Sequence, residues 1–81
     1  MKILYFSADW CQPCKVVKPF VQELEKEHNL DIEYLNVDNN SEIANEYSIK
    51  SVPTIVFIKN DSVDRIVGIT TKSKILAKIR S

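Results

Sequence analysis

The first 28 residues constrain the fold more than any other part of the chain. Residues 2–7 contain the uninterrupted apolar run Ile-Leu-Tyr-Phe, which is typical of a central β-strand covered on both faces. Apolar side chains then recur at helical spacing across residues 12–28, with charged and amide side chains between them. This second pattern predicts an amphipathic helix. A buried strand followed directly by such a helix indicates an α/β fold.

A second strand and a short helix are predicted next. Residues 31–37 have the pattern of a strand, and residues 38–41, Asp-Asn-Asn-Ser, supply turn-forming and capping side chains. The short helix that they introduce carries Ile43, Ala44 and Tyr47. Strand, helix, strand and helix in this order predict a right-handed crossover and parallel pairing of the two strands.

The last third of the chain has a different pattern. Residues 54–58 resemble another buried strand, residues 59–61 a tight turn and residues 62–67 a more polar strand. Together they predict an antiparallel hairpin. Apolar residues at helical spacing mark a final helix, for which Thr70 or Thr71 is the expected cap. The predicted order is βαβαββα, a four-stranded mixed sheet flanked by helices.

Length and charge narrow the range of functions. With 81 residues the chain has room for one modest core, so we expect a single domain over residues 1–81. We also expect it to act as a monomer. Its 11 basic and 11 acidic residues are mixed along the sequence, which argues against a nucleic-acid or membrane surface. The apolar stretch at the N-terminus is too short for a secretion signal. A cytoplasmic location is therefore expected, where thiols are kept reduced.

Two cysteines, Cys11 and Cys14, lie at the predicted junction of the first strand and the first helix. A helix N-terminus presents unpaired N–H groups and the positive end of the helix dipole, which together favour an anion. Cys11, as an exposed thiolate, can attack a disulfide, and Cys14 on the same helical face can then attack the mixed disulfide. Pro13 costs no hydrogen bond at this early helical position and stiffens the turn.

Two other interpretations of the pair remain open. Half of a zinc site would need further ligands, but the only histidine, His28, lies about fourteen helical residues, on the order of 20 Å, from Cys14. Only a metal site shared between two chains would meet the requirement, so no metal is expected within one chain. Two unreactive thiols are the other alternative.

Several motifs occur along the chain in a fixed order: FSADWCQPCK at 6–15, Pro19, LNVD at 35–38, YSIKSVPT at 47–54 and Gly68. Together these motifs resemble the thioredoxin family. The resemblance covers residues 3–79 and implies the thioredoxin fold. Family members usually begin with an extra strand and helix, so the resemblance implies a truncated form with one uncovered sheet edge.

The resemblance also implies a substrate groove. Val52 and Pro53 would be joined by a cis peptide bond beside the cysteines, leaving the backbone of Val52 free to pair with an extended substrate. Trp10 and Gly68 would complete the groove, but Gly68 is equally well interpreted as a bulge residue. Asp38 would either accept a hydrogen bond from the Trp10 indole or serve only as a turn residue.

The implied activity is that of a dithiol–disulfide oxidoreductase that reduces protein disulfides. It would bind no cofactor and would work through a redox-active Cys11–Cys14 disulfide. A flavin- and NADPH-dependent thioredoxin reductase would regenerate the dithiol, and ribonucleotide reductase would be a client. Gln12 replaces the usual glycine and is expected to shift the redox potential. Lys15 and Lys18 would place positive charge near the thiolate.

The proton chemistry departs from the family pattern. The family usually has a buried aspartate beneath the second cysteine and a lysine on the neighbouring strand, but Tyr5 and Tyr34 occupy these positions. A phenol is a poor proton acceptor at neutral pH. We therefore expect Cys14 to lose its proton to solvent or to the departing thiolate, with Asp9 as a weak candidate for assistance.

Two alternative functions follow from other features. A glutaredoxin-like, glutathione-dependent reductase would fit the short chain. Its usual site, however, reads Cys-Pro-Tyr-Cys rather than Cys-Gln-Pro-Cys, and the glycine pair of its glutathione site is missing around Val67, Gly68 and Ile69. A non-enzymatic binding subunit with a thioredoxin fold would use the uncovered sheet edge instead of the cysteines.

Overall fold

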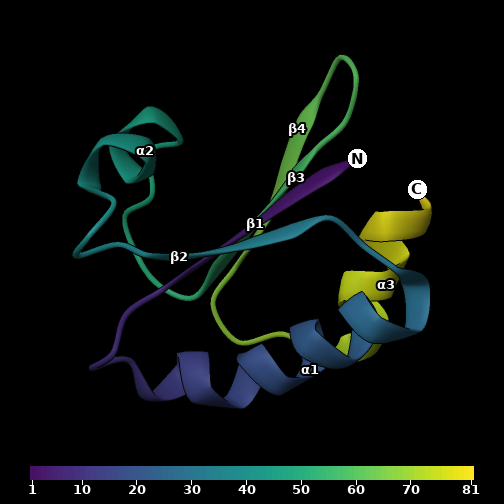
Figure 1. The fold of residues 1–81 in the computed structure, drawn as a ribbon, viewed down its shortest axis with the longest axis horizontal. Coiled ribbons are helices and arrows are strands. Elements are labelled where there is room, and N and C mark those ends of the chain that lie inside the picture. Colours follow the sequence, from purple (N-terminus) through teal and green to yellow (C-terminus); the bar gives the residue numbers. More distant parts are fainter.

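The computed structural model describes all 81 residues, and it contains four strands and three helices (Figure 1). The predicted element order is confirmed, and the predicted bounds of the first strand, the first helix and the third strand agree with the structure. None of the three helices has the length and apolar character needed to cross a membrane. The elements are β1 (Lys2–Ser7), α1 (Gln12–His28), β2 (Ile32–Asn36), α2 (Ser41–Glu46), β3 (Thr54–Ile58), β4 (Val63–Val67) and α3 (Lys72–Arg80).

The four strands form one mixed sheet in the order β2-β1-β3-β4. β1 pairs in parallel with β2 and antiparallel with β3, and β3 pairs antiparallel with β4. The predicted crossover, hairpin and mixed sheet are therefore confirmed. α1 and α3 cover one face of the sheet and α2 covers the other, so the sheet is the middle of three layers (Figure 1).

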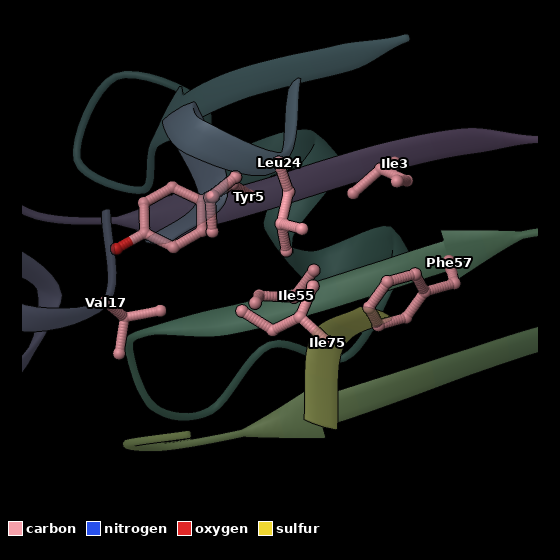
Figure 2. Packing of buried hydrophobic residues seen from close by; sticks show 8 residues of the cluster. Ile3, Tyr5, Val17, Leu24, Ile55, Phe57 and Ile75 are labelled. Carbon is pink, nitrogen blue, oxygen red and sulfur yellow. The ribbon is translucent and has the colours of Figure 1, made fainter. Parts of the chain in front are cut away.

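The central strand β1 explains the uninterrupted apolar run. Ile3 and Tyr5 point to the α1 and α3 side, where they pack with α1 residues such as Leu24. The alternate side chains, Leu4 and Phe6, point to the α2 side. Because both faces of β1 are covered, every position of the run is buried. Figure 2 shows the first of these clusters, with side chains from strands and helices converging between the layers.

Helix α1 carries the cysteines and has well-defined ends. It begins after Cys11, whose side chain caps the first turn, and ends at Asn29 in the left-handed conformation, with φ 51° and ψ 54°. Asn tolerates this conformation better than most residues. The helix continues through Pro19, and its buried side chains include Val17 and Val21, which face the sheet.

The predictions for α2 need correction at both of its ends, whereas the cap expected for α3 is present. Asn40 is the N-cap of α2 but makes no capping hydrogen bond, because its side-chain amide donates instead to the carbonyl oxygen of Asn36 at 2.9 Å. Tyr47 lies just beyond the end of α2, not within it. At α3 the cap is Thr71, whose side chain accepts from the N–H of Lys74. Thr70 is buried, and its hydroxyl has no hydrogen-bond partner.

Candidate active site

The two cysteines are joined by a disulfide at the start of α1. Cys11 is the N-cap residue, with an extended backbone of φ −90° and ψ 107°, and its sulfur accepts a hydrogen bond from the N–H of Cys14 at 3.2 Å. Ser, Thr, Asp and Asn usually fill this position, because a side-chain acceptor there satisfies an otherwise unpaired helical N–H. The same N–H and the helix dipole stabilise negative charge on Cys11 once the disulfide is opened.

Both sulfur-bearing side chains are more buried than the sequence suggested. Cys11 is 3% exposed and Cys14 is 4% exposed, so the prediction of an exposed nucleophile is wrong for the disulfide form. The reason is packing, because the two cysteines form a small apolar cluster with Ala8 and contact Val37 and Val52.

The residues between and beside the cysteines lie on the outside of the helix. Gln12 and Pro13 fill the first two helical positions, and both are exposed. Pro13 lies where its missing N–H has no partner within the helix, as predicted. Lys15 is exposed as well, and no hydrogen bond or ion pair joins its side chain to another residue.

Trp10 stands beside the cysteines and is 69% exposed. Its indole N–H donates to Oδ2 of Asp38 at 3.1 Å, so of the two roles considered for Asp38 the hydrogen bond to the indole is present. The ring also lines a hollow of about 140 Å³ together with Val52. The remaining lining residues of this hollow are Val37, Ile49, Lys50 and Ser51.

The Val52–Pro53 segment forms the other wall of this region. The peptide bond between the two residues is cis, and Pro53 is fully buried. The backbone N–H and C=O of Val52 make no hydrogen bond within the chain, so both remain available to a peptide. The structure therefore brings Trp10 and Val52 together around one hollow, as the resemblance implied.

Gly68 is connected to the same segment through its backbone. Its N–H donates to the carbonyl oxygen of Pro53 at 2.8 Å, and its φ of +85° lies in the region that favours glycine. An added Cβ would meet no atom within 4 Å. Glycine is therefore favoured at this position by the backbone conformation and not by a lack of space for a side chain. Gly68 is not among the residues that line the hollow next to Trp10.

Tyr5 is positioned directly beneath Cys14. The side chain is 0% exposed, and its hydroxyl donates to the carbonyl oxygen of Cys14 at 2.9 Å. Burial raises the pKa of Tyr5 to about 12, because the charged phenolate is poorly solvated there. Tyr5 is therefore a hydrogen-bond donor to the cysteine turn and does not serve as a base at neutral pH.

Tyr34 fills the neighbouring position on β2. Its ring meets that of Tyr5 edge to face, with centroids 5.9 Å apart, and its hydroxyl donates to Oε1 of Glu25 at 2.8 Å. Burial, followed by the bond to Glu25, raises the pKa of Tyr34 above its ordinary value. The ammonium of Lys18 lies 5.8 Å from the centre of the Tyr34 ring, within the range of a cation–π interaction.

A second hollow opens directly onto Cys14. It has a volume of about 190 Å³ and is lined by Ser7, Ala8, Asp9, Cys14, Lys15 and Lys18. Asp9, the weak candidate for assistance, and Lys18, expected to place positive charge near the thiolate, both line this hollow. Spacing offered one signal, because Lys18 follows Cys14 by four residues and so lies on the same helical face.

No group of three or more His, Cys, Asp or Glu side chains is arranged to hold a metal ion. His28 is exposed at the far end of α1, remote from the cysteines as the helical spacing predicted. The disulfide between Cys11 and Cys14 is the redox group that the structure contains.

Comparisons with known proteins agree with this geometry. The family model for thioredoxin matches residues 1–81. A thioredoxin of Rickettsia felis is 39% identical over 74 residues, which cover 88% of this chain and 70% of that protein. The solved structure of Fasciola hepatica thioredoxin has a TM-score of 0.87 at 36% identity, covering 96% of this chain and 76% of the other.

A third comparison covers nearly the whole chain. Thioredoxin 1 from Thermosipho africanus has a TM-score of 0.87 at 28% identity, covering 99% of this chain and 91% of that one. With the cysteine pair at the N-terminus of α1, these matches establish both the family and the type of chemistry. The chain belongs to the thioredoxin family, and it is a thiol–disulfide oxidoreductase that works through Cys11 and Cys14.

Proposed function

We propose that the chain reduces disulfide bonds in other proteins by two successive exchanges. In the first, the Cys11 thiolate attacks a substrate disulfide, forming a mixed disulfide and releasing one substrate thiolate. In the second, the Cys14 thiolate attacks the sulfur of Cys11, releasing the second substrate thiolate and leaving the Cys11–Cys14 disulfide. Two electrons pass from the dithiol to the substrate in the complete cycle.

One observation supports this assignment of roles most directly. The sulfur of Cys11 accepts the N–H of Cys14 at the N-terminus of α1, so a thiolate at Cys11 gains both a hydrogen bond and the favourable end of the helix dipole. Cys14 lies within the helix and its carbonyl is bound by Tyr5. Cys11 is therefore the nucleophile and Cys14 the resolving thiol.

The hollow beside Trp10 provides the proposed substrate groove. A peptide in extended conformation pairs with the free backbone groups of Val52 and packs an apolar side chain against the exposed indole. Pro53 and Gly68 support the groove, because the Gly68 N–H holds the carbonyl of Pro53. Gln12 and Lys15 are exposed on the helix beside it, where they contact the substrate.

The partners follow from this chemistry. We propose a thioredoxin reductase that draws electrons from NADPH as the regenerating enzyme, and ribonucleotide reductase as a client. A monomeric domain over residues 1–81 acting in the cytoplasm fits a cysteine pair that must return to the dithiol after each cycle, because thiols are kept reduced in that compartment.

Insulin reduction, followed by the turbidity of the released chains, tests the proposal. The wild-type protein should reduce insulin with dithiothreitol or with NADPH and a thioredoxin reductase, and Cys11→Ser should abolish the activity. The same preparation should be poor in reducing a glutathione mixed disulfide. Faster turnover of the glutathione substrate than of insulin would favour the glutaredoxin-like alternative instead.

A second candidate function rests on strand β2. It pairs with β1 alone, so its outer edge carries backbone groups that can accept a partner strand. A role as a bound, non-enzymatic subunit predicts that partner binding survives Cys11→Ser and Cys14→Ser together. Loss of partner binding in the double variant would rule out the non-enzymatic subunit and leave the reductase as the remaining candidate function.

A further inference from the structure

The second exchange requires Cys14 to lose a proton. Neither tyrosine near the site can accept it, because the Tyr5 hydroxyl donates to the carbonyl of Cys14 and the Tyr34 hydroxyl donates to Glu25. Both phenols are also held protonated by burial. The acceptor must therefore reach Cys14 from another direction, and the hollow that opens onto this residue provides the route.

The hollow beside Cys14 is large enough to admit water. Its volume is about 190 Å³, whereas one molecule in liquid water occupies about 30 Å³. Polar groups line it from the end of β1 and from the outer face of α1, and the one carboxylate among them belongs to Asp9. Water in this space can therefore connect the Cys14 thiol with that carboxylate.

Asp9 is held in place on the wall of the hollow. Its Oδ1 accepts a hydrogen bond from the side-chain N–H of Asn36 at 3.2 Å. The oxygen of the same Asn36 amide accepts the backbone N–H of Asp38 at 2.9 Å. This chain of two bonds fixes the orientation of Asn36, so its NH₂ group points to Asp9. The second carboxylate oxygen of Asp9 makes no hydrogen bond within the chain.

The charged groups around the hollow favour a thiolate at Cys14. Lys15 and Lys18 line it from α1, and Asp9 is the single opposing charge. Tyr5 approaches from β1 as a neutral donor, and Asp38 lies beyond the neutral amide of Asn36. Two ammonium groups against one carboxylate leave a net positive charge, which stabilises the sulfur anion after the proton has left.

We propose that Asp9 is the proton acceptor for Cys14, acting through water in this hollow. The proposal rests on the two-step reaction proposed above and concerns its second step. One water passes a proton to the carboxylate of Asp9 and takes the proton of the Cys14 thiol. The Cys14 thiolate then forms a bond with the sulfur of Cys11, and the bond between Cys11 and the substrate sulfur breaks.

The electron pair of that broken bond leaves on the substrate sulfur as a thiolate. The proton held by Asp9 then passes back through water to this thiolate or to solvent, so the carboxylate is restored for the next cycle. No oxidant or reductant beyond the substrate disulfide and the dithiol takes part.

A proton-accepting role for Asp9 and a purely electrostatic role predict opposite changes in the rate of the second exchange when the charge of Asp9 is removed. A carboxylate near a thiol raises the pKa of the thiol, so removing the charge of Asp9 would increase the thiolate fraction of Cys14. If Asp9 acts only as a charge, the second step of the Asp9→Asn variant is faster than in the wild type. If it takes the proton, the second step is slower.

Stopped-flow reaction of the reduced protein with the aromatic disulfide dithiobis(nitrobenzoate) separates the two steps. The first release of coloured thiolate reports attack by Cys11, and the second reports attack by Cys14. Asp9→Asn is the informative variant because the new amide oxygen can still accept from Asn36. At pH 7 we expect a second release about tenfold slower in this variant, which is below the usual effect of about 10²–10⁴-fold for a general base because solvent competes as an acceptor.

The loss should shrink to less than about twofold at pH 9, above the reference pKa of a thiol of about 8.5, where solvent removes the proton unaided. Asp9→Glu should restore the second release to within about threefold of the wild type. Asp61→Asn removes the same charge from an exposed turn residue without hydrogen bonds and should leave both releases unchanged.

An equal or faster second release in Asp9→Asn would overturn the role of Asp9, whatever the first release does. A slower second release that stays equally slow at pH 9 would overturn it as well, because it would indicate a change in geometry. A wild-type protein that gives no second release would contradict the two-step reaction itself, so failure of the two proposals can be distinguished.

Discussion

Tyr5 and Cys14 are joined by a buried hydrogen bond between the central strand and the first turn of α1. The Tyr5 hydroxyl donates to the Cys14 carbonyl at 2.9 Å, and the tyrosine side chain is 0% exposed. Because β1 is paired on both sides, the bond fixes the turn that carries the resolving thiol to the most constrained strand of the sheet. Tyr5 therefore stabilises the position of the cysteine turn, at a place in the sequence where the resemblance to the family leads one to expect a carboxylate.

Replacing Tyr5 by phenylalanine removes this bond and keeps the ring. We expect the free energy of unfolding to fall by about 1 kcal/mol, the typical net contribution of a buried hydrogen bond. Urea denaturation measures this change. Tyr34→Phe is the matched control, because its hydroxyl bonds to the partly exposed Glu25. A loss in Tyr34→Phe as large as in Tyr5→Phe would contradict the account.

Alkaline pH should weaken the fold through the same residue. The pKa of Tyr5 is about 12 in the folded chain, against about 10 in an unfolded one. The unfolded state therefore binds fewer protons than the folded state above pH 10, so stability falls as pH rises. The contribution is fully present below about pH 10 and is lost as pH rises through about 12.

Urea midpoints measured across this range test that prediction. The stability difference between the wild type and Tyr5→Phe should stay constant from pH 7 to about pH 10 and shrink above it. A difference that grows with pH would show that the folded chain binds the phenolate form more favourably, which is the reverse of what burial of Tyr5 implies.

Replacing Trp10 by alanine should weaken substrate binding. Burying about 40 Å² of the exposed ring against a peptide contributes about 1 kcal/mol, so the KM for insulin should rise about fivefold while kcat changes little. The reaction with a small aromatic disulfide should change less, because it lacks the extended peptide. Val63→Ala truncates another exposed apolar residue, on β4, and should leave KM unchanged. An equal rise in KM in both variants would show that Trp10 is not part of the substrate groove.

Gly68→Ala isolates the cost of backbone conformation. A Cβ would meet no atom within 4 Å, but the φ of +85° is unfavourable for any residue with a side chain by about 1–2 kcal/mol. We expect a loss of stability of this size in urea. Ser48 also has a positive φ, of 55°, so Ser48→Gly makes the opposite substitution. Here the relief of backbone strain in the folded state should offset the greater conformational entropy that glycine gives the unfolded chain. A Gly68→Ala variant as stable as the wild type would contradict this interpretation.

The elements that could be predicted are those in which one signal dominates. β1 was recognisable because both of its faces are buried, which leaves no polar residue in the run. α1 was recognisable because its buried residues, such as Val17 and Leu24, all lie on one face. The cysteine pair was interpretable because a helix N-terminus has a fixed electrostatic character whatever surrounds it.

The features that could not be predicted depend on packing between distant segments. The burial of Cys11 results from contact with Val37 and Val52, which come from other parts of the chain. Asn40 donates its side-chain bond to Asn36 in competition with the cap, and propensity alone does not decide between the two. The hollow beside Cys14 joins the end of β1 to the outer face of α1, so the sequence could suggest Asp9 but could not show the space that connects it with Cys14.

Trapping of the mixed disulfide tests the central claim that Cys11 attacks and Cys14 resolves. Each single serine variant, fully reduced, is mixed with insulin, quenched with acid and analysed by mass spectrometry without reductant. Cys14→Ser should accumulate a covalent adduct joined through Cys11, because the second exchange cannot occur, and Cys11→Ser should form almost none. Equal adducts in the two variants, or an adduct formed mainly through Cys14, would contradict the assignment.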